Sequence, residues 1–112
     1  NDLDLNQLSF AGGALKQDLL SYACFYKRDE FAQYLISKKV NLNNGDGIYS
    51  KVPLHWAASV QDVNILWMLI ENNADVSITN KFGFSFINSL DESNKNILLA
   101  RYDNIIGLVK AG

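Results

Sequence analysis

The chain has 112 residues, of which 48% are hydrophobic and 20% charged, with a formal net charge of −2. This length bounds it to one small domain with a modest core. The weak negative charge without a basic run argues against a nucleic-acid or membrane-surface footprint, and no apolar stretch approaches the roughly 20 residues that span a bilayer. Its single Cys excludes an internal disulfide framework and favours an intracellular location, cytoplasmic or nuclear.

Residues 1–17 open on Asp2-Leu3-Asp4, a short pattern that returns twice along the chain. It recurs as Asn41-Leu42-Asn43 and as Asp75-Val76-Ser77, which stand 34 residues apart. A period of this length indicates an array of stacked structural repeats. We therefore expect residues 1–17 to be the tail and finger of a preceding repeat, and the chain to be a fragment of a longer array.

Residues 18–51 carry the first predicted helix pair. Leu20 and the small pair Ala23-Cys24 predict a short first helix that a neighbour can approach closely, and the apolar run ending at Leu35-Ile36 predicts a second helix. Asp18 is placed to cap the first helix, because a carboxylate accepts hydrogen bonds from the free amides of a first turn.

Residues 52–84 give the clearest helix–turn–helix pattern. Pro53 suits the first position of a helix, since it lacks an N–H and has a fixed φ. The run Val63–Ile70 has a helical period, and Asn72-Asn73 ends it because Asn tolerates a left-handed conformation. An extended finger is expected from Asp75 to Phe84.

Residues 85–112 keep only part of this pattern. The small pair Ala57-Ala58 becomes Leu90-Asp91 after a shift of 33 residues, which is too large and too polar for an internal position. Apolar residues from Ile97 to Val109 keep a helical period. The segment is therefore predicted to be a degenerate C-terminal capping repeat that ends in a long helix.

The middle segment carries a family signature. Val52-Pro53-Leu54-His55-Trp56-Ala57-Ala58, followed by Ala74-Asp75-Val76-Ser77, resembles the ankyrin repeat, which reads T-P-L-H-x-A and later G-A-D-V-N. The resemblance implies an all-α solenoid of stacked helix–turn–helix units with extended finger loops, with repeats over 18–51 and 52–84 and a cap over 85–112. Lys39-Val40 departs from the pattern, where the family has Gly-Ala.

His55 and Cys24, the one His and the one Cys, are the natural candidates for nucleophilic catalysis. The repeat register places Ser21 rather than Cys24 at the position of His55, and packed helices lie about 10 Å apart, so the two cannot pair. Cys24 falls on a core position and is expected to be a buried hydrophobe, and the resemblance implies that His55 bonds to loop backbone. No metal-ligand spacing or phosphate loop is visible, so the sequence predicts no enzyme, no metal and no cofactor.

The resemblance implies a non-catalytic protein–protein interaction module that binds a protein partner through its concave groove and finger loops. Aromatic residues gather at those positions, and exposed aromatic residues are common binding hot spots. The predicted partner-binding residues are Phe25, Tyr26, Ile48, Tyr49, Lys51, Trp56, Ser59, Val60, Lys81, Phe82 and Phe84. Nucleic acid, membrane insertion and a small-molecule ligand are not expected.

Several of these aromatic residues have a packing alternative. Phe82 and Phe84 can fold back over the neighbouring repeat, and Trp56 can fill the space between helices. Trp67 is a further candidate on the outer, convex helix, where the family has a solvent-facing Lys. It either forms a second interface or is half-buried near Tyr34.

A second function remains open. Leu54-His55-Trp56-Ala57 looks like repeats in ankyrin-bearing protein S-palmitoyltransferases, and its first three residues look like repeats of fungal cell-cycle transcription regulators. The alternative is therefore a regulatory or substrate-recruiting ankyrin domain of a larger enzyme or of a transcription regulator.

Overall fold

A computed structural model describes residues 9–10, 17–45 and 50–101 of the chain. The elements in chain order are β1 (Ser9–Phe10), β2 (Gln17–Asp18), α1 (Leu19–Phe25), α2 (Asp29–Ser37), α3 (Pro53–Ser59), α4 (Val63–Glu71), the 3-10 helix η1 (Phe86–Ser89) and α5 (Glu92–Arg101).

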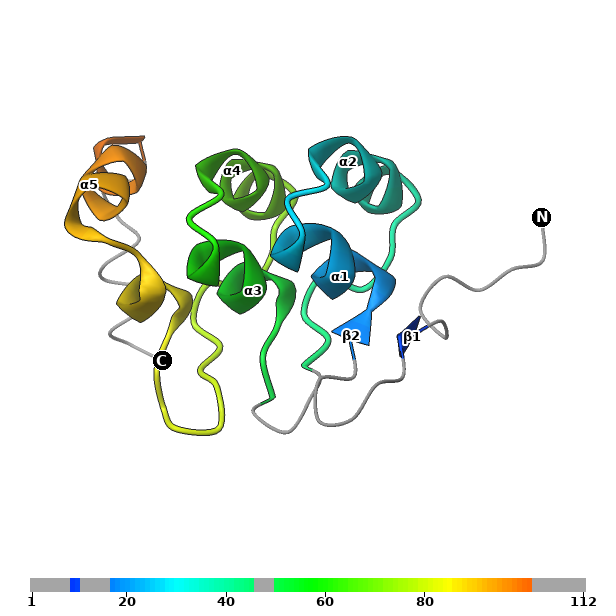
Figure 1. The fold of residues 1–112 in the computed structure, drawn as a ribbon, viewed down its shortest axis with the longest axis horizontal. Helices are drawn as coiled ribbons and strands as arrows, with labels where there is room; N and C mark the ends of the chain where they lie inside the picture. The colour runs from blue at the N-terminus through cyan, green and yellow to red at the C-terminus, as the bar shows by residue number, and fades with distance from the viewer. Residues whose placement is uncertain (1–8, 11–16, 46–49, 102–112) are drawn as a thin grey trace.

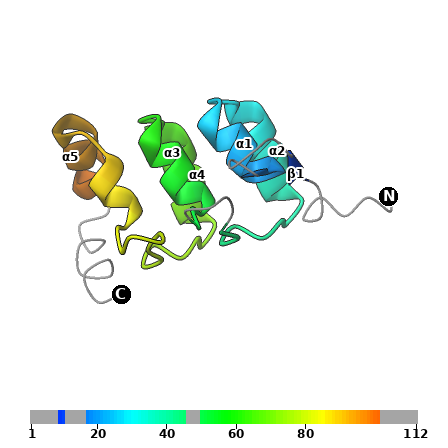
Figure 2. The same ribbon diagram turned by 60° about the horizontal axis from the view of Figure 1, so that its bottom comes forward.

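Successive helices form stacked pairs, α1 with α2, α3 with α4, and η1 with α5 (Figures 1 and 2). In Figure 1, α1, α3 and η1 make the lower layer and α2, α4 and α5 the upper layer, while the loops between pairs extend below the lower layer. The predicted all-α solenoid of helix–turn–helix units is confirmed. Within the described part of the chain, no helix is long and apolar enough to cross a membrane.

Local chemistry at the helix starts agrees with the sequence. Val52 is extended and offers no side-chain cap to α3, but its N–H donates to Nδ1 of His55 at 3.1 Å. Pro53 occupies the first turn of α3. Asp62 begins α4 by accepting the N–H of Ile65 on Oδ1 at 3.1 Å, which satisfies one of the free amides of that helix end.

Left-handed residues repeat with the same period as the helices. Lys27 and Gln61, with φ of 57° and 60°, lie in the turns inside the first two helix pairs. Lys39 and Asn73, with φ of 63° and 71°, follow α2 and α4. The predicted role of Asn73 as a helix-ending left-handed residue is confirmed, and Lys39 adopts the same conformation although a Lys side chain disfavours it.

The core lies between the stacked pairs. Ala23, Cys24, Ala57 and Ala58 are all fully buried, which lets α1 and α3 approach closely. Cys24 is thus the buried small residue that the sequence predicts. The large side chains around them come from every helix pair and are fully or almost fully buried, among them Leu35, Leu54, Ile65, Leu66, Leu69, Phe86 and Leu98.

The third pair differs from the other two because its first helix is a single 3-10 turn. The side chain of Gln61 joins this pair to the second, since Nε2 donates to the carbonyl of Ser89 at 2.9 Å and Oε1 accepts the N–H of Asp91 at 3.0 Å. Asn88 Oδ1 accepts the N–H of Ser85 at 2.9 Å and so caps η1. α5 is described to Arg101, and the rest of the predicted long helix lies outside the described residues.

Near the start of the chain, β1 and β2 form a short antiparallel ladder that the sequence analysis did not predict. Its register pairs Ser9 with Asp18 and Phe10 with Gln17. Asp18 therefore ends a strand immediately before α1 begins at Leu19.

Candidate functional site

The finger between α4 and η1 ends in a tight turn, Asn80–Phe84, which we call the finger tip. Oδ1 of Asn80 accepts the N–H groups of Phe82 at 2.9 Å and Phe84 at 3.1 Å. The Asn80 N–H donates to the carbonyl of Phe84 at 2.9 Å, and the Gly83 N–H donates to the carbonyl of Asn80 at 3.0 Å. Gly83 has φ of 83°, a conformation that Gly adopts without strain.

This turn presents large apolar side chains to solvent. Phe82 is 60% exposed and Phe84 is 54% exposed, and Lys81 between Asn80 and Phe82 is exposed as well. The alternative in which both Phe rings fold back over the neighbouring repeat therefore does not hold. The hydrogen bonds of the turn fix the backbone from which both rings project.

A strip of four aromatic rings, Tyr22, Phe25, Tyr26 and Trp56, runs from α1 to α3. Ring centroids lie 4.7 Å apart for Tyr22 and Tyr26, 5.0 Å for Phe25 and Tyr26, and 5.3 Å for Phe25 and Trp56. Tyr26 is 51% exposed, whereas Phe25 is partly buried against the core. Of the predicted partner-binding residues in this strip, Tyr26 therefore has the most surface to offer.

The expectation of an exposed ring at Trp56 is corrected by the structure. Its side chain is only 3% exposed, because the small residues that bring α1 and α3 together press it edge-on against Phe25. The ammonium of Lys51 covers the ring at 4.6 Å from its centroid, an arrangement that cation–π attraction favours. The packing alternative is the correct one for Trp56, which braces the first two helix pairs.

Trp67 is half-buried and does not present an open ring on the convex side. The guanidinium of Arg101, on α5, lies 4.5 Å from the ring centroid and also pairs with Glu71 at 2.7 Å. Trp67 therefore packs against the third helix pair, and a second interface at this ring stays a prediction. Tyr34 itself is 51% exposed on α2.

The remaining predicted residues differ in accessibility. Ser59 is exposed at the end of α3, and Val60 and Lys51 are half-buried. Ile48 and Tyr49 lie outside the described residues.

His55 is buried, and its ring bonds to the backbone at the start of α3. Its Nδ1 accepts the N–H of Val52, and the carbonyl groups of Phe84 and Ile78 lie close enough to favour a protonated ring. Burial outweighs them, and with the positive charge of Lys51 it lowers the pKa of His55 below its usual 6.5. The neutral imidazole is the form that can accept from Val52, so His55 fixes the backbone at the start of α3, while its Nε2 has no hydrogen-bond partner among the described residues.

Among the described residues, the side chains that were candidates for nucleophilic catalysis are buried. Cys24 is fully buried and His55 is 2% exposed, so neither presents its reactive atom to a substrate. Among the described residues no three His, Cys, Asp or Glu side chains come together as a metal site would require.

Sequence reasoning missed two features of this surface. Asn80 and Gly83 shape the finger tip, and an Asn three residues before a Gly is a recognisable turn signal. Tyr22 joins the aromatic strip, and its spacing of four residues from Tyr26 on a helix could have indicated the contact.

The comparison with known proteins agrees with this architecture. Palmitoyltransferase AKR1 of the yeast Lachancea kluyveri is 39% identical over 83 residues, which are 74% of this chain but only 11% of that relative. Ankyrin repeats, in three copies, match residues 2–80. The chain therefore belongs to the ankyrin repeat family.

Proposed function

We propose that this chain is a non-catalytic module that binds a protein partner through the finger tip and the exposed end of the aromatic strip. The observation that carries the proposal is the finger tip itself, where hydrogen bonds from Asn80 fix a turn that exposes Phe82 and Phe84. Membership of the ankyrin repeat family supports it, since this family is built for macromolecular recognition.

The mechanism is binding by preformed shape. A rigid aromatic side chain has few rotamers to lose, so its burial under a partner is not offset by a large entropy cost. Lys81 at the tip supplies positive charge beside the two Phe rings, which favours a partner that combines apolar and acidic side chains. A protein suits such a surface better than nucleic acid, because the net charge of the chain is −2.

The test is affinity capture with a matched control. The variant Tyr26→Ala, Phe82→Ala, Phe84→Ala removes the exposed rings, while Tyr34→Ala removes a ring of equal exposure from α2. We expect a partner to be captured by the parent and by Tyr34→Ala but lost by the triple variant. Equal capture by all three, once circular dichroism shows that each is folded, would place the binding surface elsewhere.

A further variant tests the preformed turn. Asn80→Ala keeps both Phe rings but removes the acceptor of their backbone N–H groups. We expect a partner identified as above to bind Asn80→Ala more weakly than the parent, by roughly tenfold for each 1.4 kcal/mol of lost preorganisation. Unchanged affinity would show that the turn need not be rigid.

The similarity to palmitoyltransferase AKR1 favours a second, more specific function, in which the module recruits protein substrates to an S-palmitoyltransferase. The 39% identity with a palmitoyltransferase supports this host over a transcription regulator. Under this proposal the chain acts inside the cell and brings substrates to a catalytic domain in the rest of the protein. Acyl-exchange proteomics in cells that carry the triple variant in the whole protein should show lost S-acylation for a subset of proteins. If partner binding is lost but the set of S-acylated proteins is unchanged, the module binds a partner without recruiting substrates for S-acylation, and this second proposal fails.

A further inference from the structure

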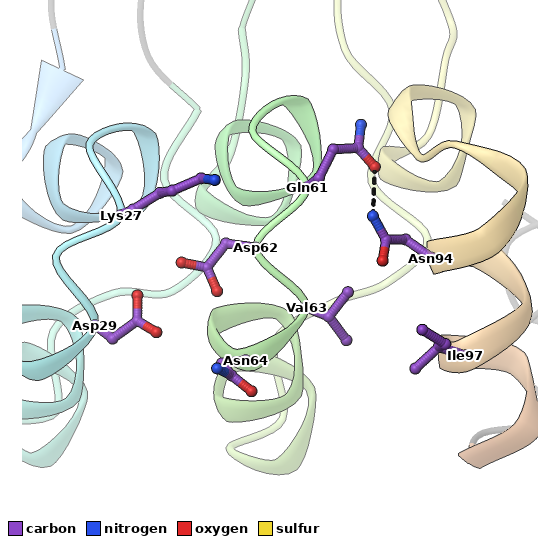
Figure 3. Close-up of a pocket in the computed structure, with 8 residues that line it drawn as sticks. All are labelled: Lys27, Asp29, Gln61, Asp62, Val63, Asn64, Asn94 and Ile97. Carbon is purple, nitrogen blue, oxygen red and sulfur yellow. Dashed lines mark hydrogen bonds between the residues drawn. The ribbon is translucent and has the colours of Figure 1, made fainter.

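A cleft of about 450 Å³ opens where the turns inside the helix pairs meet, away from the finger tip (Figure 3). Its lining combines polar side chains from all three pairs with two apolar ones: Lys27, Asp29, Gln61, Asp62, Val63, Asn64, Asn94 and Ile97. Figure 3 shows the carboxyl groups of Asp29, at the start of α2, and Asp62, just before α4, pointing toward one another. Two acidic groups from successive helix pairs thus meet at the junction.

Asp62 is held in place by its structural role. It is 9% exposed, and its Oδ1 accepts the N–H of Ile65 to cap α4. This bond holds the carboxyl group of Asp62 at the junction, where it faces Asp29.

Asp29 has an oxygen that the described surroundings leave unsatisfied. Its Oδ1 is shielded from solvent and has no hydrogen-bond partner among the described residues. A buried acceptor without a donor is costly. The proton of a neutral carboxylic acid removes this cost, because it turns an unsatisfied acceptor into a donor that Asp62 can accept from.

The charges that face Asp29 favour this protonated form. Burial is the largest cause, followed by the close approach of Asp62 and by its negative charge, and together they raise the pKa of Asp29 to about 6. The amide of Asn64 and the positive charge of Lys27 act in the opposite direction. The α5 residues that line the cleft, Asn94 and Ile97, carry no charge.

We propose that Asp29 and Asp62 form a proton-sensitive latch between the first two helix pairs: a shared proton draws α2 and the start of α4 together, and its loss makes them repel. The latch lies in the cleft and not at the finger tip, so it stands independently of the partner-binding proposal. It makes the stacking of the first two pairs responsive to pH between about 4 and about 6.

The sign of the effect follows from linkage. The native state binds the proton of Asp29 more tightly than the unfolded chain, whose Asp pKa is 3.8, so stability from this group is present at low pH. It is lost as the pH rises from about 4 to about 6. His55 has the opposite effect on stability. Its pKa in the native state lies below the 6.5 of the unfolded chain, so the unfolded chain binds the proton more readily and stability falls as the pH drops below 6.5. The latch must therefore be measured as a difference between variants.

The first test is a carbon NMR titration of the carboxyl groups in the 112-residue chain from pH 4 to pH 8. We expect the carboxyl group of Asp29 to titrate with a midpoint near 6. Asp62→Asn keeps the cap but replaces the charge with an amide donor, and should lower the midpoint of Asp29 by about one unit or more. A midpoint near 4 in the parent, or one that Asp62→Asn leaves in place, would overturn the proposal.

The second test asks whether the proton tightens the junction. Asp29→Asn supplies a permanent amide donor, so the parent should be less stable than this variant at pH 7.5, and the stability gap should narrow at pH 4.5, where the native state holds the proton. Asp75→Asn is the control, because hydrogen bonds from Ser77 keep the pKa of Asp75 below its usual 3.8 and it stays ionised at both pH values. A stability gap between the parent and Asp29→Asn that is equal at both pH values would refute the latch.

Discussion

Lys39 offers a sharp test of the fold, because the structure gives it a backbone conformation that suits a different residue. Its φ is 63°, its side chain is exposed, and its N–H donates to the carbonyl of Ile36 at 3.0 Å. The left-handed conformation costs a residue with a Cβ about 1–2 kcal/mol. Glycine removes that cost and can keep the backbone hydrogen bond.

The expected gain from Lys39→Gly is smaller than the strain that it relieves. Glycine gives the unfolded chain more freedom, which costs about 0.4–1 kcal/mol. The net stabilisation should therefore be about 0.5–1 kcal/mol. For a slope of about 1.5 kcal/mol per molar urea, the unfolding midpoint should rise by roughly 0.3–0.7 M.

Two variants separate conformation from other effects in equilibrium urea unfolding followed by circular dichroism. Lys39→Ala removes the Lys side chain but keeps the Cβ, so it should leave the midpoint nearly unchanged. Asn73→Gly should gain less than Lys39→Gly, because Asn at φ of 71° is already tolerated. If Lys39→Gly is no more stable than Lys39→Ala, the left-handed residue is not a source of strain and the reasoning fails.

Three further predictions follow from the buried and covered side chains. Trp56→Ala should lose about 3–5 kcal/mol by opening a cavity between α1 and α3, and a drop in thermal midpoint no larger than that of exposed Tyr34→Ala would contradict the packing role. Arg101→Ala should uncover the ring of Trp67 at a stability cost below about 1 kcal/mol, since its ion pair is largely exposed. Acrylamide quenching in a Trp56→Phe background, where Trp67 is the one remaining Trp, should then increase, and unchanged quenching would show that the guanidinium does not shield the ring. The imidazole of His55 should titrate by proton NMR with a midpoint below 6.5, and its neutral form should stabilise the fold above that pH and less so as the pH falls; a midpoint at or above 6.5 would be inconsistent with its burial.

Features that depend on neighbours along the chain were predictable from the sequence. Pro53 starts α3, Asn73 ends α4 in a left-handed conformation, and Ala57-Ala58 faces the core. Each of these is decided within a few residues by fixed φ, by tolerance of positive φ or by side-chain size. The period of 34 residues then repeats the local result, and the resemblance to the ankyrin repeat implied how the helix pairs stack.

Features that depend on contacts between repeats were decided only by the tertiary structure. The sequence could not place Trp56 against Phe25, nor bring Arg101 over Trp67, because each contact joins different helix pairs at a distance set by packing. For the same reason, the meeting of Asp29 with Asp62 across the junction has no signature in the sequence. A repeat pattern therefore determined the architecture of this protein, whereas side-chain packing between repeats decided which of its aromatic residues stay exposed.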